Sequence, residues 1–196
     1  MADITVVTPS HPARLRTGML TRAMRSVYNQ TLLPAAVSLA VDTDKQGAPR
    51  TRQRALEAVQ TEWTAFLDSD DEFKPEHLQK LRAFVDETGC DYAYSWYDVV
   101  GGTDPRPWMF GKPFDKENPD QTTIVMLVRT ELAKEVGFTT IGDLTDKNRL
   151  YAGEDWDFTQ KCIKAGADIQ HLPEKTWKWY HTGLNTSGLP GRGDDK

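Results

Sequence analysis

Residues 63–71 read Trp-Thr-Ala-Phe-Leu-Asp-Ser-Asp-Asp, and this stretch decides the fold. Its apolar first part predicts a buried strand, and Pro75 shortly afterwards is typical of the first position of a helix. Asp68 and Asp70 are separated by one residue, so in an extended chain their carboxylates lie on the same face. The stretch therefore predicts a buried strand that brings two carboxylates to one edge of a sheet.

Strands and helices alternate on both sides of this stretch. The expected strands cover 4–8, 37–41, 63–67 and 92–100. The expected helices cover 19–29, 50–59 and a segment from 75 to a cap at Gly89. This order predicts an α/β fold with a mostly parallel central sheet flanked by helices. Polar residues follow three of the strands, at 8–10, 42–44 and 68–71, and such sheets bind ligands at this edge.

The second half of the chain is less regular. Residues 101–121 are rich in proline and glycine, which predicts a long loop. The elements expected after it are a strand at 123–128, a helix at 130–136 closed by Gly137, a loop at 139–151, a helix at 154–165 closed by Gly166 and a last strand at 175–180. Phe158, Cys162 and Ala165 are expected to face inward on the second helix. Residues 183–196 are expected to form a flexible tail.

Composition excludes several classes of protein. The 196 residues include 24 basic and 29 acidic side chains, and the net charge of −5 argues against general nucleic-acid binding. Six Trp, six Tyr and seven Phe are too many aromatic residues for intrinsic disorder. Cys90 and Cys162 favour reduced thiols, with a single bridge as the alternative. No apolar run reaches the roughly 18 residues of a membrane span, and we expect a cytoplasmic protein of one domain.

The paired carboxylates at 68–71 point to a cation. Carboxylates on one side of a strand end repel each other unless a positive charge lies between them. Mg²⁺ and Mn²⁺ take oxygen ligands and leave room for substrate phosphates. The alternative interpretation is an acidic turn that caps the following helix.

Several stretches, in their order along the chain, resemble family 2 glycosyltransferases of the GT-A fold, which is Rossmann-like. They are Thr8-Pro9-Ser10 with Arg14, Ser26-Val27-Tyr28-Asn29-Gln30-Thr31, Val41-Asp42-Thr43-Asp44, Arg52 to Ala58, Trp63 to Asp71, Met126 to Arg129 with Val136-Gly137-Phe138, Gly153 to Phe158, and His181. The resemblance covers about residues 3–182. It implies a GT-A domain over 1–182, with a nucleotide-binding half at 1–100 and a shorter, irregular acceptor half at 101–182.

The same resemblance implies a reaction. A sugar would move from a nucleotide sugar, most often UDP-linked, to an acceptor hydroxyl by a single in-line displacement with inversion, helped by Mn²⁺ or Mg²⁺. The metal ligands would be Asp70, Asp68 and His181. The donor would be bound by Thr8, Pro9, Arg14, Asp42, Arg52, Asp68 and Ser69. Asp155 would be the general base, and Glu154 would orient the acceptor beside it.

Two tryptophans are candidates for contacts with a sugar or the acceptor. Trp108 lies in the proline-rich loop without a core periodicity around it, and Trp156 lies between acidic residues. Other polar residues have plainer interpretations. Asp155 could cap its helix, and His181 could be an ordinary hydrogen-bonded histidine. We expect His77 to be exposed, and Asp44, Asp71 and Glu72 to be solvated or capping.

Two other functions stay open at this point. A sugar-phosphate nucleotidyltransferase would have a glycine-rich loop after the first strand, and residues 8–12 contain no glycine. The second alternative is a non-catalytic module of the same fold that binds a nucleotide or a sugar. The acceptor could be a protein, a glycan, a carrier or a small molecule, while the missing QxxRW motif argues against a processive synthase. We also expect residues 184–192 to fold over the donor.

Overall fold

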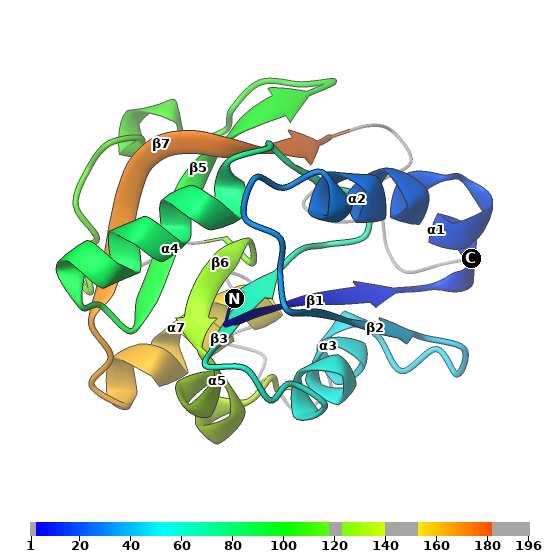
Figure 1. The fold of residues 1–196 in the computed structure, drawn as a ribbon, viewed down its shortest axis with the longest axis horizontal. Helices are drawn as coiled ribbons and strands as arrows, with labels where there is room; N and C mark the ends of the chain where they lie inside the picture. The colour runs from blue at the N-terminus through cyan, green and yellow to red at the C-terminus, as the bar shows by residue number, and fades with distance from the viewer. Residues whose placement is uncertain (1–2, 118–122, 140–152, 182–196) are drawn as a thin grey trace.

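A computed structural model describes residues 3–117, 123–139 and 153–181 of the chain (Figure 1). The first half follows the predicted alternation closely. Its main strands are β1 (Ile4–Ser10), β2 (Ala36–Val41), β3 (Trp63–Phe66) and β5 (Tyr92–Val100). Its main helices are α2 (Met19–Tyr28), α3 (Ala48–Glu57) and α4 (His77–Thr88). Two short elements were not predicted, α1 (Pro12–Arg16) and β4 (Glu72–Phe73).

The second half contains η1 (Pro107–Met109), β6 (Met126–Arg129), α5 (Thr130–Val136), α7 (Glu154–Lys164) and β7 (Ile169–Tyr180). The predicted helix at 130–136 is confirmed, with Gly137 directly after it. The last strand begins six residues before the predicted 175–180. Its first part pairs with β5, through Tyr92 opposite Ile169 and Tyr94 opposite His171.

The seven strands form one sheet in the order β2-β1-β3-β6-β5-β7-β4. β1 pairs in parallel with β2 and β3, and β5 pairs in parallel with β7. β6 lies antiparallel between β3 and β5, so β5 runs in the same direction as β1. Only β6 and β4 run the other way in the described sheet. The predicted mostly parallel sheet is therefore confirmed.

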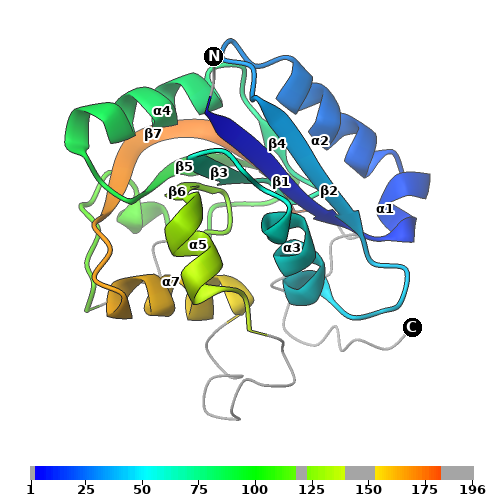
Figure 2. The same cartoon turned by 60° about the horizontal axis from the view of Figure 1, so that its bottom comes forward.

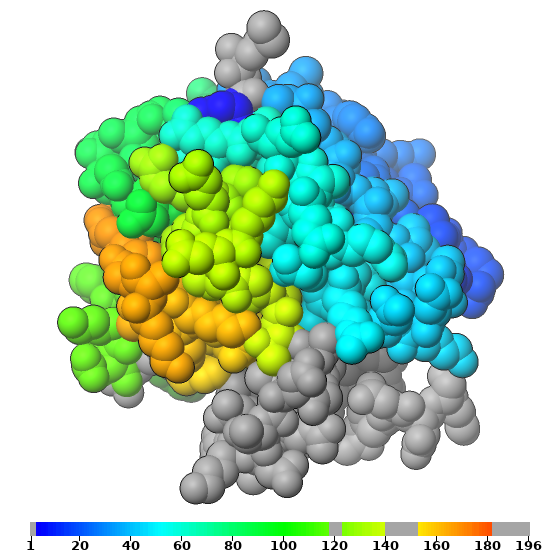
Figure 3. All heavy atoms as spheres, turned by 90° about the horizontal axis from the view of Figure 1, so that it is seen from below, coloured from blue at the N-terminus to red at the C-terminus, as the bar shows by residue number. Residues whose placement is uncertain are grey.

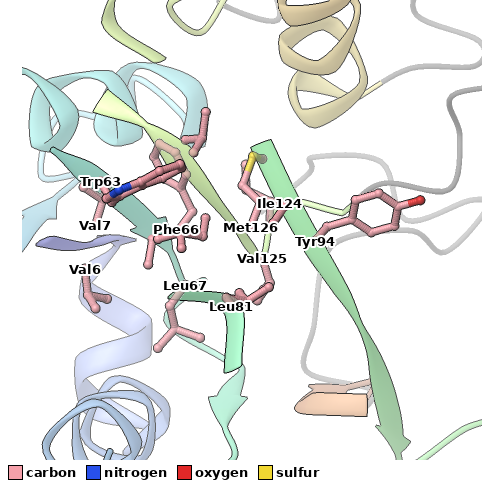
Figure 4. Packing of buried hydrophobic residues seen from close by; sticks show 14 of the residues in the cluster. Val6, Val7, Trp63, Phe66, Leu67, Leu81, Tyr94, Ile124, Val125 and Met126 are labelled. Atoms are coloured by element: carbon pink, nitrogen blue, oxygen red, sulfur yellow. The ribbon is translucent and has the colours of Figure 1, made fainter. Parts of the chain in front are cut away.

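Helices cover both faces of this sheet (Figures 1 and 2). α2 and α4 lie on one face, and α3, α5 and α7 lie on the other, which Figure 3 shows as one continuous surface. Val6 and Val7 of β1 point to opposite faces, and both are fully buried, as expected for a central strand. Between the layers, the core contains Phe66 at the end of β3, Leu67 directly after it, and Leu81 of α4 (Figure 4).

Three details of the prediction were wrong. α4 begins at His77, and Pro75 stands before its N-terminal cap instead of inside the helix. His77 is fully buried, because its ring stacks on Phe73 and its Nδ1 lies 2.6 Å from Thr176 Oγ1. Ala165 is exposed beyond the end of α7.

The two cysteines are free and buried, which confirms the preferred prediction of reduced thiols. Cys162 faces the core from α7, as expected for the inward face of that helix. Among the described helices, none is both long enough and apolar enough to cross a membrane. The expected tail at 183–196 lies outside the described residues.

Candidate active site

The acidic loop after β3 (Asp68–Asp71) sits at the carboxyl edge of the sheet. Leu67 N donates to Val7 O at 3.0 Å, which holds the start of the loop against β1. Asp71 N donates to Asp68 O at 3.1 Å and turns the chain back. Oxygen atoms of Asp68, Asp70 and Asp71 lie within 4.8 Å of one another. This is a set of hard oxygen donors, and it fits a divalent cation such as Mg²⁺ or Mn²⁺.

Burial disfavours the ionised forms of these carboxylates. Burial and the charges of Asp70 and Asp68 hold the pKa of Asp71 well above its ordinary value. Burial, opposed in part by Arg52, also raises the pKa of Asp68. Asp71 was expected to be solvated or to cap the next helix, and this was wrong, because it is buried and its Oδ1 accepts a bond from Tyr180 N at 3.0 Å. A bound cation would offset the repulsion within this group.

Glu72, the next residue, was also expected to be solvated or capping. Its side chain is instead half-buried beside the end of β7. Oε1 pairs with Lys178 Nζ at 3.1 Å, and Oε2 accepts the hydroxyl proton of Tyr180 at 2.6 Å. Asp44 is exposed, in agreement with the prediction.

Arg52 of α3 connects the acidic loop to the start of α7. Its Nη2 lies 2.8 Å from Asp68 Oδ1, and its Nη1 lies 3.0 Å from Glu154 Oε1. The guanidinium is 2% exposed and stays charged, because the two carboxylates outweigh the cost of burial and raise its pKa. Carboxylates that are far apart in the sequence therefore face one another across a single side chain. Arg52 was predicted as a donor contact, and its bridge to Glu154 was not foreseen.

Asp155 follows Glu154 in the first turn of α7. Burial and the neighbouring charge of Glu154 raise the pKa of Asp155. Burial also favours the neutral form of Glu154, but the charge of Arg52 brings the pKa of Glu154 below its ordinary value. Asp155 Oδ1 accepts a bond from Trp156 N at 2.9 Å. A Cβ at Gly153 would lie 2.8 Å from the same oxygen, so the glycine leaves room for this carboxylate.

The residues expected to bind the donor lie at the ends of β1 and β2. Thr8 and Ser10 are buried, and their hydroxyl groups have no hydrogen-bond partner in the described part of the chain. Asp42 accepts bonds from Gln46 N at 2.9 Å and Gly47 N at 2.8 Å. Burial raises the pKa of Asp42, but these backbone bonds together with the charge of Arg54 outweigh it and bring the pKa below its ordinary value. Asp42 thus holds the turn that follows β2.

Three further donor candidates lie close by. Ser69 is buried between the two carboxylates of the acidic loop. Pro9 precedes Ser10 in β1 and is buried with it. Arg14 of α1 reaches the acidic loop directly, with its Nη1 2.6 Å from Asp70 Oδ2.

Other predicted residues are not brought into this group. His181 stacks on Trp179 with ring centroids 4.8 Å apart, and its ligand atoms are outside the carboxylate set found among the described residues. Trp108 on η1 is 62% exposed. The loop before it is fixed to β5 through Asp104, whose Oδ2 accepts a bond from Trp96 Nε1 at 2.7 Å. Trp156 is half-buried beside Asp155.

Sequence reasoning missed Arg22 on α2. Its guanidinium donates to the backbone carbonyl of Asp70 and lies 3.6 Å from the ring centroid of Tyr180. Its partners are far along the chain, so no local pattern indicates the contact. Arg22 also lines a hollow of about 530 Å³ between α2 and β4. This hollow lies on the α2 side of the sheet, whereas Asp155 belongs to a helix on the other side.

Comparisons with known proteins show the family and the fold. Residues 20–152 match the model of the family described as glycosyl transferase family 2. A putative teichuronic acid biosynthesis glycosyltransferase, TuaG of Bacillus subtilis, is 34% identical over 73 residues, which are 37% of this chain and 26% of that protein. The poly(ribitol-phosphate) beta-N-acetylglucosaminyltransferase TarS of Staphylococcus aureus is 27% identical over 142 residues, 70% of this chain and 24% of that protein. The matches thus span about a quarter of each relative.

Solved structures show the same fold. The crystal structure of S. aureus TarS 1-349 in complex with UDP-GlcNAc matches with a TM-score of 0.77 at 20% identity, over 96% of this chain and 62% of that one. The complex of the same fragment with UDP matches with a TM-score of 0.71 at 21% identity, over 92% and 60%. The likeness supports the predicted GT-A architecture.

Proposed function

Because the chain belongs to glycosyl transferase family 2, we propose that it transfers a sugar from a UDP-sugar to an acceptor hydroxyl with inversion. The observation that carries the proposal is the Arg52 bridge. It places the carboxylates suited to a cation opposite the first turn of α7, where Asp155 lies. The acidic loop can then stabilise the leaving diphosphate through its cation, while Asp155 accepts the proton of the acceptor hydroxyl.

The donor half of the proposal concerns residues 1–100. The buried hydroxyls of Thr8 and Ser10 have no hydrogen-bond partner among the residues that the structure describes, and buried polar groups normally have one. A nucleoside at the ends of β1 and β2 would supply it, with Pro9 beside it and Asp42 facing the base. The solved structures of TarS with UDP and with UDP-GlcNAc favour uridine as the nucleoside.

The diphosphate would lie over the acidic loop. In the proposal Asp68 and Asp70 hold Mn²⁺ or Mg²⁺, which when bound neutralises charge on the leaving diphosphate. Ser69, buried between these two residues in the chain, is a further proposed donor contact. His181 is the third proposed ligand; its ring stacks on Trp179 and lies outside the carboxylate set found among the described residues.

The acceptor half concerns residues 101–182. Asp155 takes the proton of the acceptor hydroxyl, and its raised pKa makes it a stronger base than an ordinary aspartate. Glu154 stays ionised on Arg52 and orients the acceptor beside Asp155. Trp156 and Trp108 are the proposed contacts with sugar rings. The relatives' names refer to teichuronic acid and poly(ribitol-phosphate), which favours a glycan or polyol acceptor.

Thermal unfolding tests the donor and the metal together. The protein is heated with UDP, GDP or CDP, each with and without Mn²⁺. At 100 times its dissociation constant a ligand adds about 2.7 kcal/mol, a shift of about 5–10 °C in a domain of this size. We expect a shift with UDP that depends on Mn²⁺ and is lost in Asp70→Asn but kept in Asp44→Asn, since Asp44 is exposed. No shift with any nucleotide would contradict the proposal.

A further inference from the structure

Arg14 occupies the carboxylate that the proposed metal needs. Its Nη1 lies 2.6 Å from Asp70 Oδ2, and both side chains are about one-tenth exposed. The same nitrogen lies 3.0 Å from Met19 Sδ, and Nε donates to His11 Nε2 at 3.1 Å. Asp70 is therefore already paired with a cation that belongs to the chain itself.

α1 depends on this contact for its position. The helix has five residues, and Arg14 is the one that is buried. Leu15, the next residue, is 48% exposed. No side chain caps the N-terminus of α1, and Gly18 follows it with a φ of 75°, a left-handed conformation that glycine adopts freely. Loss of the pair with Asp70 would leave α1 without its buried anchor.

The two arginines of the acidic loop differ in this respect. Arg52 is held by two carboxylates at once and sits beneath the loop at 2% exposure. Arg14 has one carboxylate partner among the described residues and comes from a short helix. A divalent cation on Asp70 would face the Arg14 guanidinium at close range, and the two positive charges repel. Arg14 is thus the cation that can leave.

We propose that Arg14 holds Asp70 as an internal cation and is exchanged for the divalent metal when the nucleotide binds. The freed guanidinium then turns to the diphosphate, whose oxygens suit its fork of donors. The inference rests on the proposed function, since it assumes a divalent cation at Asp68 and Asp70. It makes metal binding weak without the nucleotide and strong with it, because each ligand assists the other.

Manganese binding measures this exchange without using activity. Free Mn²⁺ is followed by electron paramagnetic resonance during titration of the wild type, Arg14→Gln and Arg16→Gln, with and without UDP. Arg16 is exposed on the same helix and is the matched control. Without UDP, we expect Arg14→Gln to bind Mn²⁺ about tenfold more tightly than the wild type, within the usual range of coupling between sites. UDP should strengthen Mn²⁺ binding less in Arg14→Gln than in the wild type, and Arg16→Gln should match the wild type.

Hydrogen exchange of residues 12–17 provides a second measurement that keeps Arg14 in place. In the wild type without UDP, exchange in this segment should rise when Mn²⁺ is added at a concentration high enough to fill its weak site. In Asp70→Asn it should be high from the start and insensitive to Mn²⁺. This variant also decides the matter if Arg14→Gln fails to fold.

The outcomes separate the inference from the proposed function. If the wild type binds Mn²⁺ with UDP but Arg14→Gln binds Mn²⁺ no more tightly, the exchange is wrong and the proposed function stands. Unchanged exchange at 12–17 on metal binding has the same meaning. If UDP binds and Mn²⁺ binds to neither protein, both the metal in the proposed function and the exchange of Arg14 are wrong.

Discussion

The two carboxylate groups of the site are held in opposite ways. In the acidic loop, Asp68 and Asp70 each pair with a buried guanidinium. At the start of α7, Glu154 takes the other arm of Arg52, while Asp155 accepts a backbone bond and keeps a raised pKa. Carboxylates that already have cationic partners are prepared to exchange one cation for another. Asp155 is half-buried and pairs with no side-chain cation among the described residues, so it is prepared to take a proton.

Removing the charge of Asp155 should have the largest effect, because it removes the proton acceptor and leaves the acidic loop unchanged. We expect Asp155→Asn to lower kcat by about 10³-fold, within the range for loss of a general base, while UDP and Mn²⁺ bind as before. The same variant should be more stable at pH 7. A pKa raised by folding means that the folded state disfavours the ionised carboxylate, so the amide removes a cost. Transfer rates, nucleotide titration and thermal unfolding measure the three effects.

Asp157→Asn is the control for Asp155. Asp157 lies in the same first turn, but its Oδ2 pairs with Lys161 Nζ at 2.9 Å. The transfer rate of Asp157→Asn should stay close to that of the wild type.

The pH profile of the wild type tests the raised pKa of Asp155. As the pH is lowered, kcat/KM should begin to fall at a higher pH than it would if the base were an aspartate of ordinary pKa. A transfer rate in Asp155→Asn close to wild type would remove Asp155 as the base.

Arg52→Met tests the link between the two groups. It leaves the half-buried carboxylates of Asp68 and Glu154 without their common cation. Because their side chains are 31% and 21% exposed, the loss should lie at or below the roughly 3–5 kcal/mol that removal of one partner costs in a fully buried pair. Urea unfolding should show this loss. Arg50→Gln, at an exposed position of the same helix, should change the stability by less than about 0.5 kcal/mol. Equal stability of the two variants would mean that the contacts of Arg52 with Asp68 and Glu154 do not stabilise the fold.

Much of the fold could be predicted from local patterns. The buried runs of β1, β3 and β5 and the capped ends at Gly89 and Gly137 carry their signals within a few residues. The position of β6 between β3 and β5 carries no such signal, because it depends on pairing between distant strands. The first part of β7 was missed because Pro173 and the charged residues after it interrupt the apolar pattern.

The site shows the same limit. Asp68 and Asp70 could be predicted because they directly follow a strand, and Asp155 because it begins a helix. The order of these motifs along the chain resembles that of family 2 glycosyltransferases. The pairing of Arg14 with Asp70 and of Arg52 with Glu154 could not be found, since each joins segments that only the fold brings together. Pro75 and Glu76 suggested an exposed first turn, and the burial of His77 under β4 and β7 was missed for the same reason.

Gly153→Ala tests how precisely the carboxylate of Asp155 must be placed at the start of α7. The backbone at this position suits alanine, but the added Cβ would lie 2.8 Å from Asp155 Oδ1 and move the carboxylate. We expect a loss of about tenfold in kcat, because small displacements at a reacting group are costly, and little change in stability. Added to Asp155→Asn, the glycine substitution should have no further effect on kcat. An equal loss in both backgrounds would place its action elsewhere.

His77 tests whether a titratable side chain that is buried in its neutral form affects stability without any role in the site. Burial lowers the pKa of His77 to about 3, against about 6.5 in an unfolded chain. Below pH 6.5 the unfolded chain therefore takes up a proton that the folded protein excludes, and stability falls by up to about 1.4 kcal/mol per pH unit. His77→Asn keeps a polar atom facing Thr176 and should flatten the decline in stability between pH 7 and pH 5.5. Its transfer rate at pH 7 should equal that of the wild type, in contrast to Asp155→Asn. An unchanged decline in the variant would show that other groups cause it, and a lost rate would mean that the α4 side of the sheet positions the acidic loop.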